Sequence, residues 1–192
     1  MGIWDAITGR SRVKANNLDA LFNVPNAAIT LQTAAGLMPT GVGSVCFRSA
    51  AGAAFAETRD DVVELIRSDA QAPSVEVTDD GFGYTWLVVR RAPDDVTGLC
   101  TDLHAVNTNL EVQGFASGLL CSVVPFADRS GRRVGLVYLY KQGTFYAFAP
   151  LAGEAQARDN LLEISVRDQL TGELPMETDL SRWFALWGAP GL

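Results

Sequence analysis

Hydrophobic and polar residues recur along the chain with two periods, one typical of helices and one typical of strands. After Pro93-Asp94-Asp95, apolar residues return every three or four positions until Gly114, which predicts an amphipathic helix that ends at the glycine. Over 74–78, Val75 and Val77 alternate with polar residues, which predicts a strand. The apolar positions of the helix are Val96, Leu99, Leu103, Val106 and Leu110.

The same two patterns assign most of the chain. Further helices are predicted over 26–36, 57–70 and 158–170, with a turn or two of helix over 18–22. Strands are predicted over 41–47, 74–78, 84–90, 119–126, 134–140 and 144–149. Glycine- and aspartate-containing turns join several of these strands as hairpins.

The order of these elements predicts an α+β fold. Hairpins pair their strands antiparallel, whereas a parallel sheet needs a crossover helix between strands. We therefore expect a single antiparallel, twisted sheet of about five or six strands with helices packed on one face. The length of 192 residues fits a single domain over 1–192, with an amphipathic N-terminal segment over 1–16 and an aromatic C-terminal tail over 173–192.

Composition narrows the classes of function. The formal net charge is -7 and the pI about 4.6, which disfavours binding to nucleic acid. No apolar run approaches the roughly 20 residues that span a bilayer, so membrane contact is at most peripheral. The N-terminus lacks the layout of a signal peptide, and Ala6 departs from the myristoylation pattern.

Metal and cofactor sites are not expected from the residues available. The chain has three cysteines, far apart in sequence, and a single histidine. No C-x-x-C pair is present, and the glycines of 41–44 precede a strand, so they match no phosphate-binding loop. Cysteines of this kind are typical of buried thiols in a reducing compartment, which predicts a cytoplasmic protein.

One pair of residues offers nucleophilic chemistry. Cys100 and His104 stand one helical turn apart, the spacing at which a thiol and an imidazole can meet. Asp102 stands two positions before His104, about 200° around a helix, and cannot orient the imidazole. Cys100 also follows Leu99 on the apolar side, so we interpret it as packing and expect no enzymatic activity.

Aromatic residues near both termini are the candidate interaction sites. In the tail, Trp183, Phe184 and Trp187 either pack across the sheet or present a docking element. We favour packing for Trp183 and Phe184 and leave Trp187 open. Near the N-terminus, an apolar side formed by Ile3, Trp4 and Ile7 precedes basic residues, which fits either weak interfacial contact or packing onto the domain.

Several blocks of sequence are distinctive in combination. They are Met1-Gly2-Ile3-Trp4-Asp5-Ala6, Leu18-Asp19-Ala20-Leu21-Phe22, Pro39-Thr40-Gly41-Val42-Gly43-Ser44-Val45-Cys46-Phe47, Gly83-Tyr84-Thr85-Trp86-Leu87-Val88, Thr101-Asp102-Leu103-His104-Ala105-Val106-Asn107, Val137-Tyr138-Leu139-Tyr140-Lys141-Gln142-Gly143-Thr144-Phe145-Tyr146 and Asp179-Leu180-Ser181-Arg182-Trp183-Phe184 with Trp187-Gly188-Ala189-Pro190-Gly191-Leu192. Together these blocks resemble the PspA-associated protein family PspAB, found mainly in actinobacteria and archaea, over nearly the whole chain.

This resemblance implies a role in the phage-shock envelope-stress response. The implied partners are a PspA-like membrane-remodelling protein and an HtpX-like membrane protease, and the family has no catalytic motif to carry over. The expected function is that of a non-catalytic adaptor recruited to the inner face of the membrane. The segment 96–150 also resembles the YbjN-like and type III secretion chaperone-like fold. The alternative function is therefore a secretion-chaperone-like module that binds peptides, either as a monomer or as a homodimer.

Overall fold

The computed structural model describes residues 17–48, 64, 74–80, 84–153 and 156–192. Its strands are β1 (Met38–Pro39), β2 (Val42–Arg48), β3 (Ser74–Asp79), β4 (Tyr84–Arg90), β5 (Leu119–Ala127), β6 (Arg133–Leu139) and β7 (Thr144–Phe148). Its helices are the 3-10 helix η2 (Leu18–Asn23), α1 (Val24–Ala35), α3 (Val96–Val112), α4 (Asn160–Leu170) and the 3-10 helix η3 (Leu180–Arg182).

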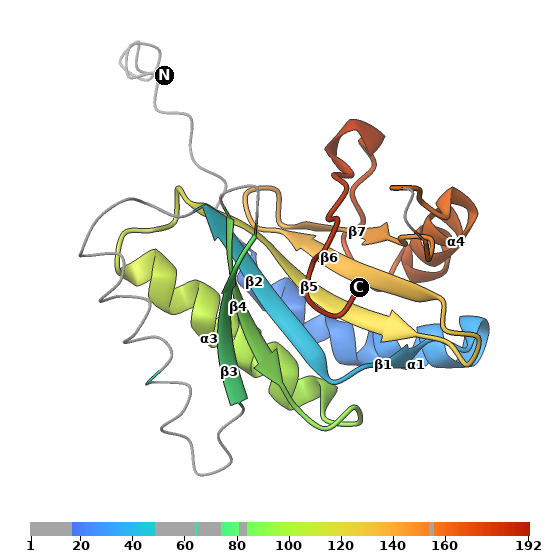
Figure 1. Cartoon of the computed structure of the whole chain (residues 1–192), viewed down its shortest axis with the longest axis horizontal. Helices are drawn as coiled ribbons and strands as arrows, with labels where there is room; N and C mark the ends of the chain where they lie inside the picture. The colour runs from blue at the N-terminus through green and yellow to red at the C-terminus, as the bar shows by residue number, and fades with distance from the viewer. Residues whose placement is uncertain (1–16, 49–63, 65–73, 81–83, 154–155) are drawn as a thin grey trace, which may run out of the picture.

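All the strands belong to one twisted antiparallel sheet (Figure 1). The order across the sheet is β3-β4-β2-β5-β6-β7, and the two-residue β1 pairs with β5. Two three-stranded groups therefore meet where β2 pairs with β5. The α+β prediction is confirmed, with β1 as a seventh short strand beyond the five or six expected. The helix predicted over 57–70 lies outside the described residues, apart from residue 64.

Helix ends lie where the cap residues of the sequence indicate. Gly36 follows α1 with a φ of 66°, and its N–H donates to Gln32 O at 3.2 Å, so a left-handed residue closes the helix. At the start of α3, the Asp95 carboxylate accepts a hydrogen bond from the Gly98 N–H at 2.9 Å. The carboxylate of Asp159 caps α4 in the same way, at 3.0 Å from the Leu162 nitrogen.

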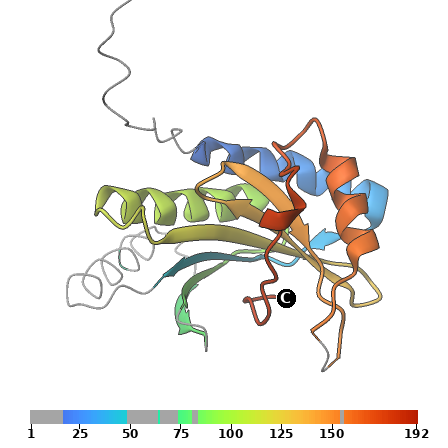
Figure 2. The ribbon, with the colours of Figure 1, turned by 90° about the horizontal axis from the view of Figure 1, so that it is seen from above.

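Helices cover one face of the sheet (Figure 2). The apolar stripe predicted for α3 is buried there against β2, β4 and β5. A polar contact inside this layer joins α3 to the sheet: Asn107 Nδ2 donates to Ser122 Oγ at 2.8 Å and to Leu103 O at 2.7 Å. Because a buried amide needs such partners, the contact fixes where α3 lies along β5.

The opposite face of the sheet is also apolar, and the C-terminal segment 177–192 packs across part of it. Trp183 and Ala189 of this segment join Tyr146, Phe148 and other buried side chains of the strands in a second core. The chain end reaches β6, where a Cβ on Gly135 would come within 2.9 Å of Leu192 Cδ1. The sheet is thus covered on both faces, by helices on one and by irregular chain on the other.

A buried ion pair joins the end of β4 to α3. Arg91 Nε donates to Asp102 Oδ2 at 2.8 Å, and Arg91 Nη2 donates to Asp102 Oδ1 at 3.0 Å. Both side chains are largely buried, whereas the neighbouring pair of Arg90 and Glu76 is exposed. This bidentate ion pair fixes the position of α3 relative to the end of β4.

We expect Arg91→Ala to destabilise the protein by about 3 kcal/mol, because it leaves the buried Asp102 carboxylate without its charged partner. The matched variant Arg90→Ala removes an exposed pair and should cost less than about 1 kcal/mol. Urea denaturation of both variants measures the difference. Equal losses would show that the Arg91–Asp102 pair contributes no more than a surface ion pair.

Candidate functional site

The C-terminal segment is attached to the edge strand β7 by main-chain contacts. Glu177 N–H donates to Phe145 O at 2.7 Å, and Phe145 N–H donates to Pro175 O at 2.9 Å, next to a parallel bridge between Phe145 and Met176. The segment therefore leaves the edge of the sheet as a short added strand. From this edge it turns onto the face opposite the helices.

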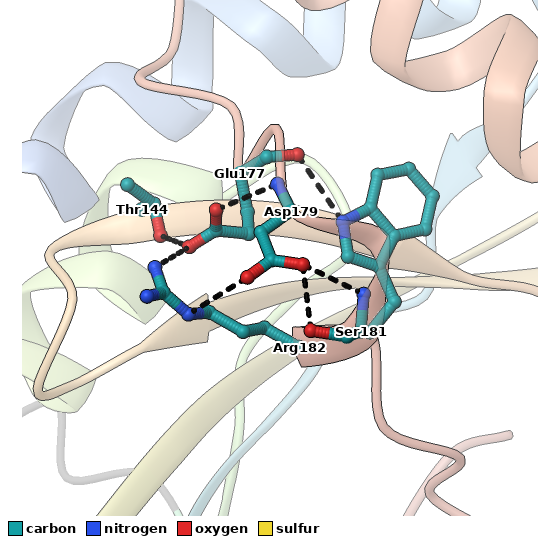
Figure 3. A network of polar contacts seen from close by, with 6 residues as sticks. Thr144, Glu177, Asp179, Ser181 and Arg182 are labelled. Carbon is teal, nitrogen blue, oxygen red and sulfur yellow. Dashed lines mark hydrogen bonds and ion pairs between the residues drawn. The ribbon is translucent and has the colours of Figure 1, made fainter.

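The Glu177 carboxylate is the polar anchor of this turn (Figure 3). Thr144 Oγ1 donates to its Oε2 at 2.9 Å, and the Asp179 N–H donates to its Oε1 at 2.9 Å. Arg182 Nη1 lies 3.4 Å from Oε2, and Trp183 Nε1 donates to Glu177 O at 3.2 Å. Burial on its own raises the pKa of Glu177, but these hydrogen bonds and the Arg182 charge together lower it.

A second buried carboxylate holds the next part of the segment. Glu163 Oε1 accepts hydrogen bonds from the Ala149 N–H at 2.8 Å and from Arg158 Nε at 2.9 Å. Arg158 Nη1 in turn donates to Trp183 O at 2.7 Å. The Trp183 ring lies 5.8 Å from the Tyr146 ring, so one tryptophan is fixed by both polar and aromatic contacts.

Beside this segment, the same face of the sheet carries a groove of about 770 Å³. Its floor consists of one side chain from each of five adjacent strands of the sheet, β4, β2, β5, β6 and β7. They are Trp86, Cys46, Cys121, Leu139 and Tyr146. One wall is the C-terminal stretch 184–187, and the rim includes Asp80, Lys141 and Arg182. An apolar floor with a polar rim is the usual form of a binding site.

Hydrogen bonds hold the walls of the groove in place. Asp80 accepts from the Tyr84 N–H at 2.9 Å and from Trp86 Nε1 at 3.2 Å, which fixes the indole at one end. At the other end, Tyr146 Oη donates to Phe184 O at 2.9 Å. Burial raises the pKa of Tyr146, so this phenol stays a neutral donor. The groove is therefore formed before any ligand arrives.

Comparison with known proteins identifies the family. The family model described as PspA associated protein B matches residues 1–191. The chain belongs to this family. Its description associates the chain with PspA, and the resemblance inferred from the sequence is confirmed. No match was found among curated proteins or among solved structures. The likeness to YbjN-like and secretion chaperone-like folds stays a prediction.

The three candidate interaction residues of the tail differ in how far they are exposed. Trp183 is 6% exposed, so the packing expected of it is confirmed. The packing predicted for Phe184 was wrong, because this residue is 60% exposed, although its carbonyl accepts a hydrogen bond from Tyr146. Trp187 is half-buried, with its ring 5.1 Å from that of Phe148.

No interaction role has been tested for these tail residues. The N-terminal candidates Ile3, Trp4 and Ile7 lie outside the described residues. The groove floor was missed from the sequence altogether. The available signal was the nearly unbroken apolar composition of 119–127 and 134–139, since strands with one solvated face alternate instead.

The structure places Cys100 and His104 in different surroundings. Cys100 is a fully buried residue of α3 in the helix-covered core, and burial raises the pKa of its thiol to about 12. His104 instead contacts η2, with Nε2 at 3.3 Å from Asp19 Oδ1 and its ring 4.8 Å from that of Phe22. This environment disfavours a thiolate at position 100.

The described part of the chain contains neither a metal-ligand cluster nor a membrane-spanning helix. There, no three side chains among histidine, cysteine, aspartate and glutamate gather closely enough to hold a metal ion. No helix within those ranges has both the length and the apolar character needed to cross a bilayer.

We expect Glu177→Gln to destabilise the protein by about 1 kcal/mol near neutral pH, because the charge-assisted hydrogen bonds of the tail are weakened. A lowered folded pKa means that this stabilisation is present above the unfolded glutamate pKa of about 4.3 and is lost as the pH falls through the folded value. Urea denaturation at several pH values should therefore show the difference from the wild type shrinking on acidification. Glu173→Gln, at an exposed position, is the control, and a difference independent of pH would refute the role of the Glu177 charge.

The adjacent variants Trp183→Ala and Phe184→Ala should behave in opposite ways. Loss of the buried indole is expected to cost about 3–5 kcal/mol, whereas loss of the exposed ring should stay within about 0.5 kcal/mol. Thermal and urea denaturation of the two proteins measure this contrast. Comparable losses would mean that the tail does not lie on the sheet as described.

Proposed function

We propose that this chain is a non-catalytic adaptor of the phage-shock envelope-stress response and binds a PspA-type protein through the apolar groove. Membership of the PspA-associated family supports the partner, and the pre-formed groove supports the mode of binding. Protein-binding sites combine buried apolar floors with a few protruding aromatic anchors. Phe184 supplies such an anchor at the groove wall.

The groove suits an apolar segment of a partner protein. Beyond the floor, the exposed side chains of Leu180 and Phe184 extend the apolar surface along the tail. A partner segment that places apolar side chains over Trp86 and Leu139 would cover surface that the tail leaves open. An HtpX-like protease is a further proposed partner, although the family description supports PspA more directly.

We place the protein in the cytoplasm, where it would reach a PspA-type partner at the inner face of the membrane. The three cysteines are free thiols and all are buried, which suits a reducing compartment. The alternative function is a secretion-chaperone-like module that binds extended or helical segments and forms a homodimer. Light scattering of the purified protein distinguishes the two functions, because a constitutive dimer favours the chaperone-like module.

The binding test uses the purified full-length chain and the PspA-type protein of its own host. The wild type should bind, and Phe184→Ala should weaken binding at least about tenfold, equivalent to roughly 1.4 kcal/mol. Leu161→Ala is the matched control, because Leu161 lies on α4 at 85% exposure and does not line the groove. Titration calorimetry measures all three affinities.

Two outcomes would contradict the proposal. Absence of binding by the wild type would remove PspA as the direct partner. Equal affinity of the Phe184→Ala variant and the wild type would remove the groove wall as the binding surface.

A further inference from the structure

Two thiols lie opposite one another in the floor of the groove. Cys46 on β2 and Cys121 on β5 are direct partners in the antiparallel register, and both belong to the core on the groove side of the sheet. They stand at the junction between the two three-stranded groups. Neither forms a disulfide in the structure, and the tail anchors use neither of them.

The register brings the two residues within the range of a disulfide. Directly opposed residues of antiparallel strands have Cα atoms about 4.5–5.5 Å apart, and disulfides span about 4.4–6.8 Å. The pairing register shifts between Cys46 and Phe47, where β5 carries one extra residue, Leu120, so the pair lies beside a bulge in the ladder.

Access distinguishes this pair from the third cysteine. Cys46 and Cys121 are only 3% and 4% exposed, but both line the groove. Cys100 lies on the other side of the sheet in the core covered by helices. Cys100 therefore serves as an internal control, because a reaction confined to the groove should leave its thiol unmodified.

We propose that Cys46 and Cys121 form a modification site at which a hydroperoxide closes an intramolecular disulfide. One thiol loses its proton, and the thiolate attacks an oxygen of hydrogen peroxide. The O–O bond breaks, and the departing hydroxide takes up a proton, so that a sulfenic acid and one water form. The second thiol then attacks the sulfenic sulfur, the S–O bond breaks, and a second water leaves. The two sulfurs lose two electrons in total, and the peroxide gains them.

The surroundings of the pair set how the reaction responds to pH. The neighbouring Cys121 thiol, burial and the Asp80 carboxylate all raise the pKa of Cys46. Because the thiolate is the nucleophile, the reaction is slow near neutral pH and accelerates as the pH rises. The resulting bond would fasten β2 to β5 across the floor of the groove, at the place where a ligand would rest.

The test treats the purified, fully reduced chain with hydrogen peroxide, then denatures it, alkylates free thiols and measures the intact mass. The expected product has lost two hydrogen atoms, carries one alkyl group on Cys100 and shows a Cys46–Cys121 link in peptide mapping. Dithiothreitol should reverse it. The rate of disulfide formation should rise at least several-fold as the pH is raised.

Matched variants and an unfolded control keep the result interpretable. Cys46→Ser and Cys121→Ser should each abolish the product, whereas Cys100→Ser should retain it. Circular dichroism confirms that each variant is folded. The chain oxidised in urea should lose this selectivity and link Cys100 as well.

Three results would overturn the proposal. They are full alkylation of all three cysteines after peroxide treatment, a link that involves Cys100 in the folded chain, and sulfinic acid accumulating on one cysteine without a disulfide. None of these readouts requires a binding partner, so they are independent of the proposed adaptor function.

Discussion

The structure depends on one constraint: the sheet is apolar on both faces, and each face must be kept from water. The helices α1 and α3 meet this requirement on one side. On the other side the only described cover is the segment 177–192, which packs over part of that face. The groove over Cys46, Trp86 and Cys121 is the part of this face that the segment leaves open. The proposed binding surface is thus the part of this apolar face that the segment leaves uncovered.

Irregular chain can cover a sheet only if its polar groups find partners there. Glu177 and Glu163 provide these partners, one at the edge of β7 and one from α4. Each carboxylate accepts several hydrogen bonds, and each is joined to an arginine. Through Arg158 and the Glu177 carbonyl, both converge on Trp183. Because the groove wall begins at the next residue, these buried carboxylates position the groove wall as well as the core.

Local sequence signals predicted the elements well and the site poorly. The ends of α1 and α3 follow from Gly36 and Asp95, because caps depend on neighbouring residues alone. The tail has no such period, so only the three-dimensional contacts reveal that Trp183 points inward and Phe184 outward. Likewise, the pairing of Cys46 with Cys121 depends on β2 and β5 being neighbours, although two strands separate them in sequence.

The central claim is that the groove, rather than the helical face, receives the PspA-type partner. Hydrogen–deuterium exchange of the full-length chain, with and without this partner, tests it most directly. If the partner binds in the groove, backbone amides in the groove-lining stretches 119–121 and 184–187 should exchange more slowly, with α1 and α4 unchanged. Slower exchange confined to α1 and α4 would contradict it and place the partner on the helical side.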